Sequence, residues 1–331
     1  MHFTSALHIG DQHEEEGISH KAISSDTLQA AQMACLAKMG VNIPDNGNLG
    51  FTVSSTFPYY QKDAQSTPIY FLPMPLQATL PQLTDVSKAK MVKKVQWVDA
   101  TLYSQVLSGE KFFDGTDAYL SHIQESYLTP TEIPADTNGS KEFVKSEVAQ
   151  RVCIANRTGR EDAKPYFVDR IVFRDHSGLY FLAMGDTTLL DKGLAMLSQE
   201  GIGTDRHVGM GFFEYFTDTL TLQLPTDADH QVALSLFIPE NPEQMQQMLA
   251  SDSVAYDFTR RGGWITTYPH NTLRKNAIYG FMPGSVFRKT GEEAISCIGK
   301  IVDLTPTVGD MTPSHKIWRN GTSIMLPIKI R

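Results

Sequence analysis

The sequence has little of what would mark a secreted, membrane-spanning or metal-holding protein. Only three of its 331 residues are cysteines, Cys35, Cys153 and Cys297, and they lie far apart without CxxC or Cys/His spacing. This pattern argues against both a disulfide framework and a zinc site. No stretch approaches the ~20 apolar residues of a membrane span, and residues 1–10 lack the basic head and long apolar run of a signal peptide. We expect a cytoplasmic protein without a cofactor.

Positive charge is also scarce, because 29 Lys and Arg residues stand against 37 Asp and Glu residues and give a net charge of −8. Free-standing nucleic-acid-binding domains are normally basic, so the total charge argues against that class. The charge is unevenly spread, however. Between Asp257 and Lys289 the only acidic residue is Asp257 itself, against Arg260, Arg261, Arg274, Lys275, Arg288 and Lys289. The remaining surface is correspondingly acidic, as a surface that packs against basic partners could be.

Length and composition bound the architecture. Apolar residues make up 41% of the chain and charged residues 20%, which is enough apolar surface for a globular core and excludes global disorder. Single cores usually stop growing at about 250–300 residues. We therefore expect two domains.

The apolar spacing predicts alternating strands and helices. Residues 1–9 alternate as a half-buried strand does, and Ser24 or Ser25 can cap a helix that ends at Gly40. Further elements expected before residue 225 are strands at Phe51–Phe57 and Ile69–Leu72, one helix face from Met91 to Val106 with lysines near its start, a hairpin of Tyr166–Phe173 with Leu179–Ala183, a helix at Thr188–Gln199 and a strand at Phe212–Leu224.

Residues of about 73–164 are interpreted as an insertion, because prolines and loop residues dominate much of the segment. Without the insertion the element order is β-α-β-β-α-β, which is the ferredoxin-like order and also that of the RNA-recognition motif. After residue 225, a strand at Val232–Ile238, a helix at Pro242–Ala250 and at least three later strands permit a second copy. The sequence thus predicts an α+β protein of two ferredoxin-like (RRM-like) domains, residues 1–224 with the insertion and residues 225–331.

The densest functional signal is the glycine-rich segment GIGTDRHVGMG at residues 201–211. Its glycines allow positive φ angles and close approach to a ligand, and they could expose amides that suit phosphates, while Arg206 and His207 could add charge or stacking. The segment is not GxGxxG, follows a predicted helix and has no Walker lysine, so it differs from nucleotide-binding fingerprints. An RNA-backbone loop and a simple flexible turn are both open.

A second candidate is the segment Arg260-Arg261-Gly262-Gly263-Trp264. Guanidinium groups can hold phosphates, glycines permit close approach and an indole can stack on a base. The alternative is a turn between strands with Trp264 in the core.

The glycine-rich segment, followed by Phe212-Phe213-Glu214, resembles the signature of the RAMP superfamily of CRISPR proteins. Further segments are similar to the family of the fourth Csm subunit of type III-A effector complexes, and they follow that family's order over nearly the whole chain. These segments are Leu7-His8-Ile9-Gly10, Ser25-Asp26-Thr27-Leu28, Phe71-Leu72-Pro73-Met74-Pro75-Leu76, Asn156-Arg157-Thr158-Gly159, Gly284-Ser285-Val286-Phe287 and Trp318-Arg319-Asn320-Gly321. Two segments depart from the family's pattern: Met74 stands where a basic residue is frequent, and Thr204-Asp205 replaces the commoner Gly-Lys or Ser-Lys.

The resemblance implies a non-catalytic subunit, present in one copy, that caps one end of the effector complex. It would hold the repeat-derived 5′ handle of the crRNA, dock the large polymerase/cyclase-like subunit and adjoin a backbone RAMP subunit, with no homo-oligomer and no membrane. The residues expected to contact RNA are Gly201, Gly203, Arg206, His207, Gly209 and Gly211 of the glycine-rich segment, together with Arg157, Arg261, Arg274, Lys275, Lys93 and Lys94.

Three alternatives are open at this point. The first is a metal-independent endoribonuclease that processes CRISPR repeats, for which His8, His20 and His207 are the candidate bases. None of them pairs with a Tyr or Lys at a diagnostic spacing, so we expect no enzyme. The second is an interaction module without an RNA role, and the third is a RAMP subunit of a neighbouring type III subtype.

Overall fold

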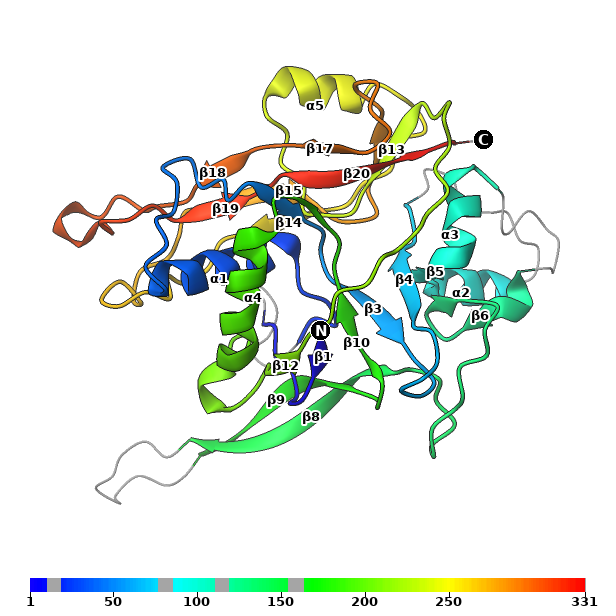
Figure 1. The fold of residues 1–331 in the computed structure, drawn as a ribbon, viewed down its shortest axis with the longest axis horizontal. Helices are drawn as coiled ribbons and strands as arrows, with labels where there is room; N and C mark the ends of the chain where they lie inside the picture. Colours follow the sequence, from blue (N-terminus) through cyan, green and yellow to red (C-terminus); the bar gives the residue numbers. More distant parts are fainter. Residues whose placement is uncertain (11–18, 77–85, 111–118, 154–163, 331) are drawn as a thin grey trace.

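The computed structural model describes residues 1–10, 19–76, 86–110, 119–153 and 164–330 (Figure 1). The chain is a mixed α+β protein, which confirms the α+β class predicted from the sequence. Its α-helices are α1 Ser25–Lys38, α2 Val86–Lys94, α3 Ala100–Leu107, α4 Thr188–Glu200 and α5 Pro242–Met248. Its strands are β1 His2–Phe3, β2 Phe51–Val53, β3 Phe57–Tyr60, β4 Ile69–Pro73, β5 Trp97–Asp99, β6 Ile123–Gln124, β7 Tyr127–Leu128, β8 Val144–Cys153, β9 Lys164–Phe173, β10 Ser177–Tyr180, β11 Ala183–Gly185, β12 Phe213–Glu214, β13 His230–Ala233, β14 Phe258–Arg261, β15 Ile278–Phe281, β16 Val286–Arg288, β17 Ser296–Ile298, β18 Ile301–Asp303, β19 Trp318–Asn320 and β20 Ser323–Ile328. No helix within these ranges is long and apolar enough to cross a membrane.

Two sheets form most of the body. The larger has the strand order β10-β3-β4-β5-β7-β6 and is antiparallel except for the parallel pair of β5 and β7. The smaller has the order β16-β13-β20-β17 and is antiparallel throughout. Two hairpins accompany the sheets: β8 with β9, which is long and extends away from the body in Figure 1, and the shorter β14 with β15.

α1 packs against α4. Both helices lie where the sequence predicts them. Leu28 and Leu36 of α1 and Leu194 and Leu197 of α4 are buried in one apolar cluster. Gly193 lets the helices approach closely, because a Cβ at this position would lie 1.9 Å from Oε1 of Gln32 on α1. This pair of helices positions the glycine-rich segment, which begins where α4 ends.

A second apolar cluster joins the first two thirds of the chain to the last third. Leu102 and Val106 of α3 are buried in it together with Val232 of β13 and Leu326 of β20. The backbone also connects these parts, since the amide of Ser55 donates to the carbonyl of Leu234 over 2.9 Å. The two predicted domains therefore share a continuous apolar core.

The single helix predicted from Met91 to Val106 is wrong. α2 ends at Lys94, residues Trp97–Asp99 form β5, and α3 begins at Ala100. The Asp99 side chain accepts the backbone amide of Thr101 over 2.8 Å and so caps α3, while β5 pairs with β4. The chain consequently stays in the sheet after Pro73, and Lys93 and Lys94 lie at the end of a helix instead of its start.

The predicted hairpin of Tyr166–Phe173 with Leu179–Ala183 is also wrong. β9 pairs along its whole length with β8, whereas β10 pairs with β3. The strand predicted at Phe212–Leu224 is limited to β12, which pairs with β1. Apolar alternation indicates an extended chain in each case but does not specify the partner strand.

Candidate nucleic-acid interface

The glycine-rich segment links α4 to β12 and folds tightly against the N-terminal residues. Several of its amides are used inside the protein: Gly211 donates to the carbonyl of Ala6 over 2.8 Å, Thr204 to that of His8 over 3.0 Å, and Ile202 to that of Gly211 over 3.0 Å. These three donors are therefore paired within the fold. Backbone donors already paired in the fold are not available to a ligand.

Three of the four glycines are required by contacts within the chain. All three have positive φ, and an added Cβ would lie 2.7 Å from the Met210 carbonyl oxygen at Gly201, 2.4 Å from that of His8 at Gly203 and 1.9 Å from that of Ile202 at Gly211. Gly209 differs, because its φ is +89° yet a Cβ there would meet nothing within 4 Å. The glycine pattern therefore reflects a tight turn, and only Gly209 leaves open space beside the backbone.

The side chains of the segment carry its charge to the surface. Arg206 and His207 lie in a short 3-10 turn at Arg206–Val208, where His207 is exposed and Arg206 is half-buried. Asp205, which stands where a lysine is common in the resembling family, forms an ion pair with Arg151 of β8 over 2.7 Å. Arg151 therefore neutralises the acid in this segment and fixes it to the β8–β9 hairpin.

His8 lies beside the same segment but is held as a structural residue. Its side chain is buried, and Nδ1 lies 2.6 Å from the carbonyl oxygen of Asp169 on β9. The Asp169 carboxylate in turn accepts the amide of Ser19 over 3.0 Å. These bonds connect the N-terminal residues to the hairpin.

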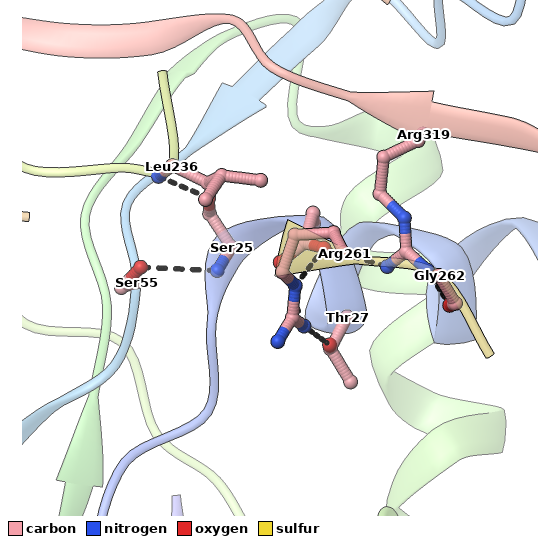
Figure 2. Close-up of polar contacts among 8 residues, drawn as sticks. Ser25, Thr27, Ser55, Leu236, Arg261, Gly262 and Arg319 are labelled. Carbon is pink, nitrogen blue, oxygen red and sulfur yellow. Dashed lines mark hydrogen bonds and ion pairs between the residues drawn. The ribbon is translucent and has the colours of Figure 1, made fainter. Parts of the chain in front are cut away.

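Arg261 is committed to a buried ion-pair cluster around Asp26, at the first turn of α1 (Figure 2). The Asp26 carboxylate is fully buried; Arg261 Nε lies 2.9 Å from it, and a guanidinium nitrogen of Arg319 on β19 lies 2.6 Å from it. Arg261 also donates to Oγ1 of Thr27 over 2.7 Å. Arg261, which the sequence predicts to contact RNA, is thus engaged within the fold, because a buried carboxylate that lost this partner would be left incompletely paired.

The electrostatics of the cluster favour the ionised carboxylate. Burial alone would raise the pKa of Asp26, but the positive charges of Arg319 and Arg261 outweigh it and hold that pKa well below its usual value. Arg319 also donates to the carbonyl of Gly262 over 3.0 Å. The cluster therefore fixes the start of the turn between β14 and β15 against α1 and β19.

The loop between β14 and β15 carries two of the cations expected from the sequence, Arg274, which is exposed, and Lys275, which is half-buried. Trp264 is 49% exposed, so its predicted alternative as a core residue is wrong. The Arg274 guanidinium lies 4.7 Å from the centre of the Trp264 ring, which is cation–π geometry, and Arg274 is exposed. A cation and an aromatic face presented together suit a nucleotide, whose phosphate and base need one each.

Lys275 lies next to Arg274 and close to the cluster. Burial and the charge of Arg319 lower the pKa of Lys275 to about 8, with Asp26 opposing and Arg261 adding to the shift. Within the described ranges its ammonium group has no hydrogen-bond partner among the side chains. The buried carboxylate of Asp26 thus lies among three cations, Arg261, Arg319 and Lys275. This leaves a net positive charge that a bound anion would relieve.

Two other lysines that were expected to contact RNA do not lie near this loop. Lys93 and Lys94 are exposed at the end of α2, on the opposite side of the body from α4 in Figure 1. Arg157 is outside the described residues. In the described part of the chain no group of three or more His, Cys, Asp or Glu side chains could hold a metal ion.

The family model and the relatives that match this chain all carry the name Csm4. Residues 226–328 match the family model of the CRISPR Csm4 C-terminal domain. The chain is 29% identical over 292 residues to the CRISPR system Cms protein Csm4 of Mycobacterium tuberculosis, covering 85% of each chain. It is 25% identical over 301 residues to the protein of that name from Streptococcus thermophilus, covering 87% of this chain and 86% of the relative.

Solved structures share the fold. A chain in the crystal structure of the Csm1-Csm4 cassette in complex with cA4 superposes with a TM-score of 0.52 at 18% identity, covering 99% of this chain and 98% of that one. A chain in the crystal structure of the Csm3-Csm4 subcomplex of the type III-A CRISPR-Cas interference complex gives a TM-score of 0.52 at 16% identity, covering 99% of both.

Proposed function

The chain is a RAMP protein of the Csm4 family, and on that premise we propose that it is the capping subunit of a type III-A CRISPR effector complex that holds the 5′ handle of the crRNA. We propose as partners the large polymerase/cyclase-like subunit and a backbone RAMP subunit. The similar structures, which contain Csm1 with Csm4 and Csm3 with Csm4, support this choice.

We also propose the domain organisation expected from the sequence, two ferredoxin-like domains that meet at residues 224 and 225. The match of the C-terminal family model from residue 226 supports this boundary. The proposed role is structural and not catalytic.

The observation that carries the RNA proposal is the turn between β14 and β15. On a chain with a net charge of −8, Arg274 stacks on the half-exposed Trp264 and Lys275 adds a cation without a side-chain partner in the described ranges. Arg206 and His207 of the glycine-rich segment provide a second group of contacts. Cations that contact phosphates displace counterions, so their contribution has a measurable dependence on salt.

Changing Arg206, Arg274 and Lys275 together to Ala should weaken the hold of the assembled complex on its crRNA. Each phosphate contact that is lost should reduce the slope of log affinity against log salt by about 0.7, hence by about 2 for three contacts. The measurement is crRNA affinity of the reconstituted complex at several salt concentrations. Lys62→Ala is the control, because this exposed lysine lies on the turn after β3, away from α4. An unchanged slope in the triple variant would contradict the RNA assignment.

The affinity for RNA should also fall between pH 7 and pH 9. Lys275 has a pKa of about 8, so it loses its charge in this range, whereas the neighbouring Arg261 and Arg319 stay protonated and Asp26 stays ionised. If binding needs the protonated amine, affinity should drop by up to about ten-fold from pH 7 to pH 9. Binding at constant ionic strength measures this, and Lys275→Arg should abolish most of the drop. An equal drop in both proteins would exclude Lys275 as its source.

A further inference from the structure

The outward face of the β14–β15 hairpin is unusually aromatic. In this antiparallel pair Phe258 stands opposite Phe281 and Arg260 opposite Tyr279, so these four side chains share one face. Phe258 is 56% exposed and Tyr279 is 60% exposed. Their rings contact each other edge to face, with centroids 5.9 Å apart.

The opposite face of the hairpin packs against the body of the protein. Gly280 lies against Leu236, whose side chain would be 3.0 Å from an added Cβ, and Arg261 reaches the buried Asp26. On the outward face, Phe281 packs against the buried rings of Phe237 and Phe287. The rings of Phe258 and Tyr279 stay more than half exposed, so the core does not depend on them. Exposed aromatic side chains grouped on one surface mark a binding site more often than isolated ones do.

The aromatic surface continues beyond the strand pair in both directions. Tyr256, 46% exposed, contacts Phe281 edge to face with centroids 5.1 Å apart. In the other direction the same hairpin leads to Trp264 with Arg274 stacked on it. Aromatic rings thus follow the hairpin from its base to its turn.

Charge indicates which class of partner this face suits. Protein interfaces lose charged residues at their centres, whereas surfaces that bind single-stranded nucleic acid combine aromatic rings with cations. Between Asp257 and Lys289 the sequence has basic residues and no acid other than Asp257. The Asp26 cluster also holds the hairpin in place, so little ordering would accompany binding.

We propose that the outward face of β14 and β15 is a base-stacking platform for single-stranded RNA, with Phe258 and Tyr279 as its rings. This inference rests on the proposed function, because it takes the guide strand of the complex as the ligand. The bases stack on the rings, and the phosphates run toward Arg274 and Lys275.

The test compares the complex containing Phe258→Ala with Tyr279→Ala against one containing Phe258→Tyr with Tyr279→Phe. A short single-stranded RNA of handle sequence is the probe, and affinity is measured across a salt series. Loss of stacking should weaken binding by about five-fold or more for each base, and the slope against salt should stay unchanged because no charge is removed. The conservative variant should bind like the parent protein.

Two outcomes would overturn the platform. Unchanged affinity in the alanine variant is one. Loss of a neighbouring subunit from the purified complex, with RNA binding retained, is the other, because it would make the face a protein-docking surface. Failure of the proposed function would look different: the Arg206, Arg274 and Lys275 variant would keep its RNA affinity and salt slope.

Discussion

Replacing Asp26 with Asn should destabilise the protein by about 3–5 kcal/mol, the range observed when one partner of a buried ion pair is removed. The substitution keeps the size of the side chain but leaves the guanidinium groups of Arg261 and Arg319 facing each other without a countercharge. Urea unfolding followed by circular dichroism measures the change as a lower midpoint with an unchanged slope.

The control is Glu200→Gln, which removes the ion pair between α4 and Lys38 of α1. Both side chains are partly exposed there, so the loss should be below about 1 kcal/mol. Comparable losses in the two variants would contradict the role assigned to the buried cluster.

The pH dependence of stability provides a second measurement on Asp26. Because its folded-state pKa lies well below its unfolded-state value, its contribution is complete above the unfolded pKa of about 4 and is lost as pH falls through the folded pKa. The parent protein should therefore lose stability below about pH 4. In Asp26→Asn this part of the acid dependence should be missing.

Gly211→Ala should cost about 3 kcal/mol or more and should loosen the glycine-rich segment. The backbone at Gly211 has φ of +76°, and the new Cβ would lie 1.9 Å from the carbonyl oxygen of Ile202, so both strain and a clash with backbone result. Relief requires breaking the bonds that Gly211 makes with Ala6 and Ile202. Thermal unfolding and amide hydrogen exchange of residues 201–211 are the measurements.

Gly209→Ala is the matched control for that prediction. Its φ of +89° carries a similar backbone strain, but no atom lies within 4 Å of the new Cβ. The cost should therefore be only about 1–2 kcal/mol. If the two alanine variants were equally stable, the close approach of Gly211 to Ile202 would not hold in solution.

The sequence predicted elements whose signals are local. α4 buries Leu190, Leu194 and Leu197 along one face, and α1 buries Leu28, Cys35 and Leu36. A glycine with positive φ follows each helix, Gly40 and Gly201, and both helices are confirmed at nearly the expected bounds. The helix predicted across Met91–Val106 failed because two short helices in succession can continue one apolar spacing. Asp99, which ends β5 and caps α3, was the local sign of the break.

The roles of the candidate site residues depended on distant contacts. Arg261 meets Asp26, 235 residues away in sequence, and nothing in the spacing of either residue predicts that pair. Phe258 and Tyr279 were missed because each lies in a short strand, where exposure depends on which face the fold covers. The alternation of Phe258-Thr259-Arg260-Arg261 was the available signal, since it places one aromatic and one basic residue on the same side.

The apolar cluster that α3 shares with β13 and β20 also constrains how this polypeptide can mature. During synthesis, Leu102 and Val106 leave the ribosome long before Val232 and Leu326, which cover them in the finished protein. The nascent chain must keep this surface from aggregating until β20 has been made. A gene split after codon 224 would therefore divide this cluster between two fragments and leave apolar surface uncovered on each until they meet.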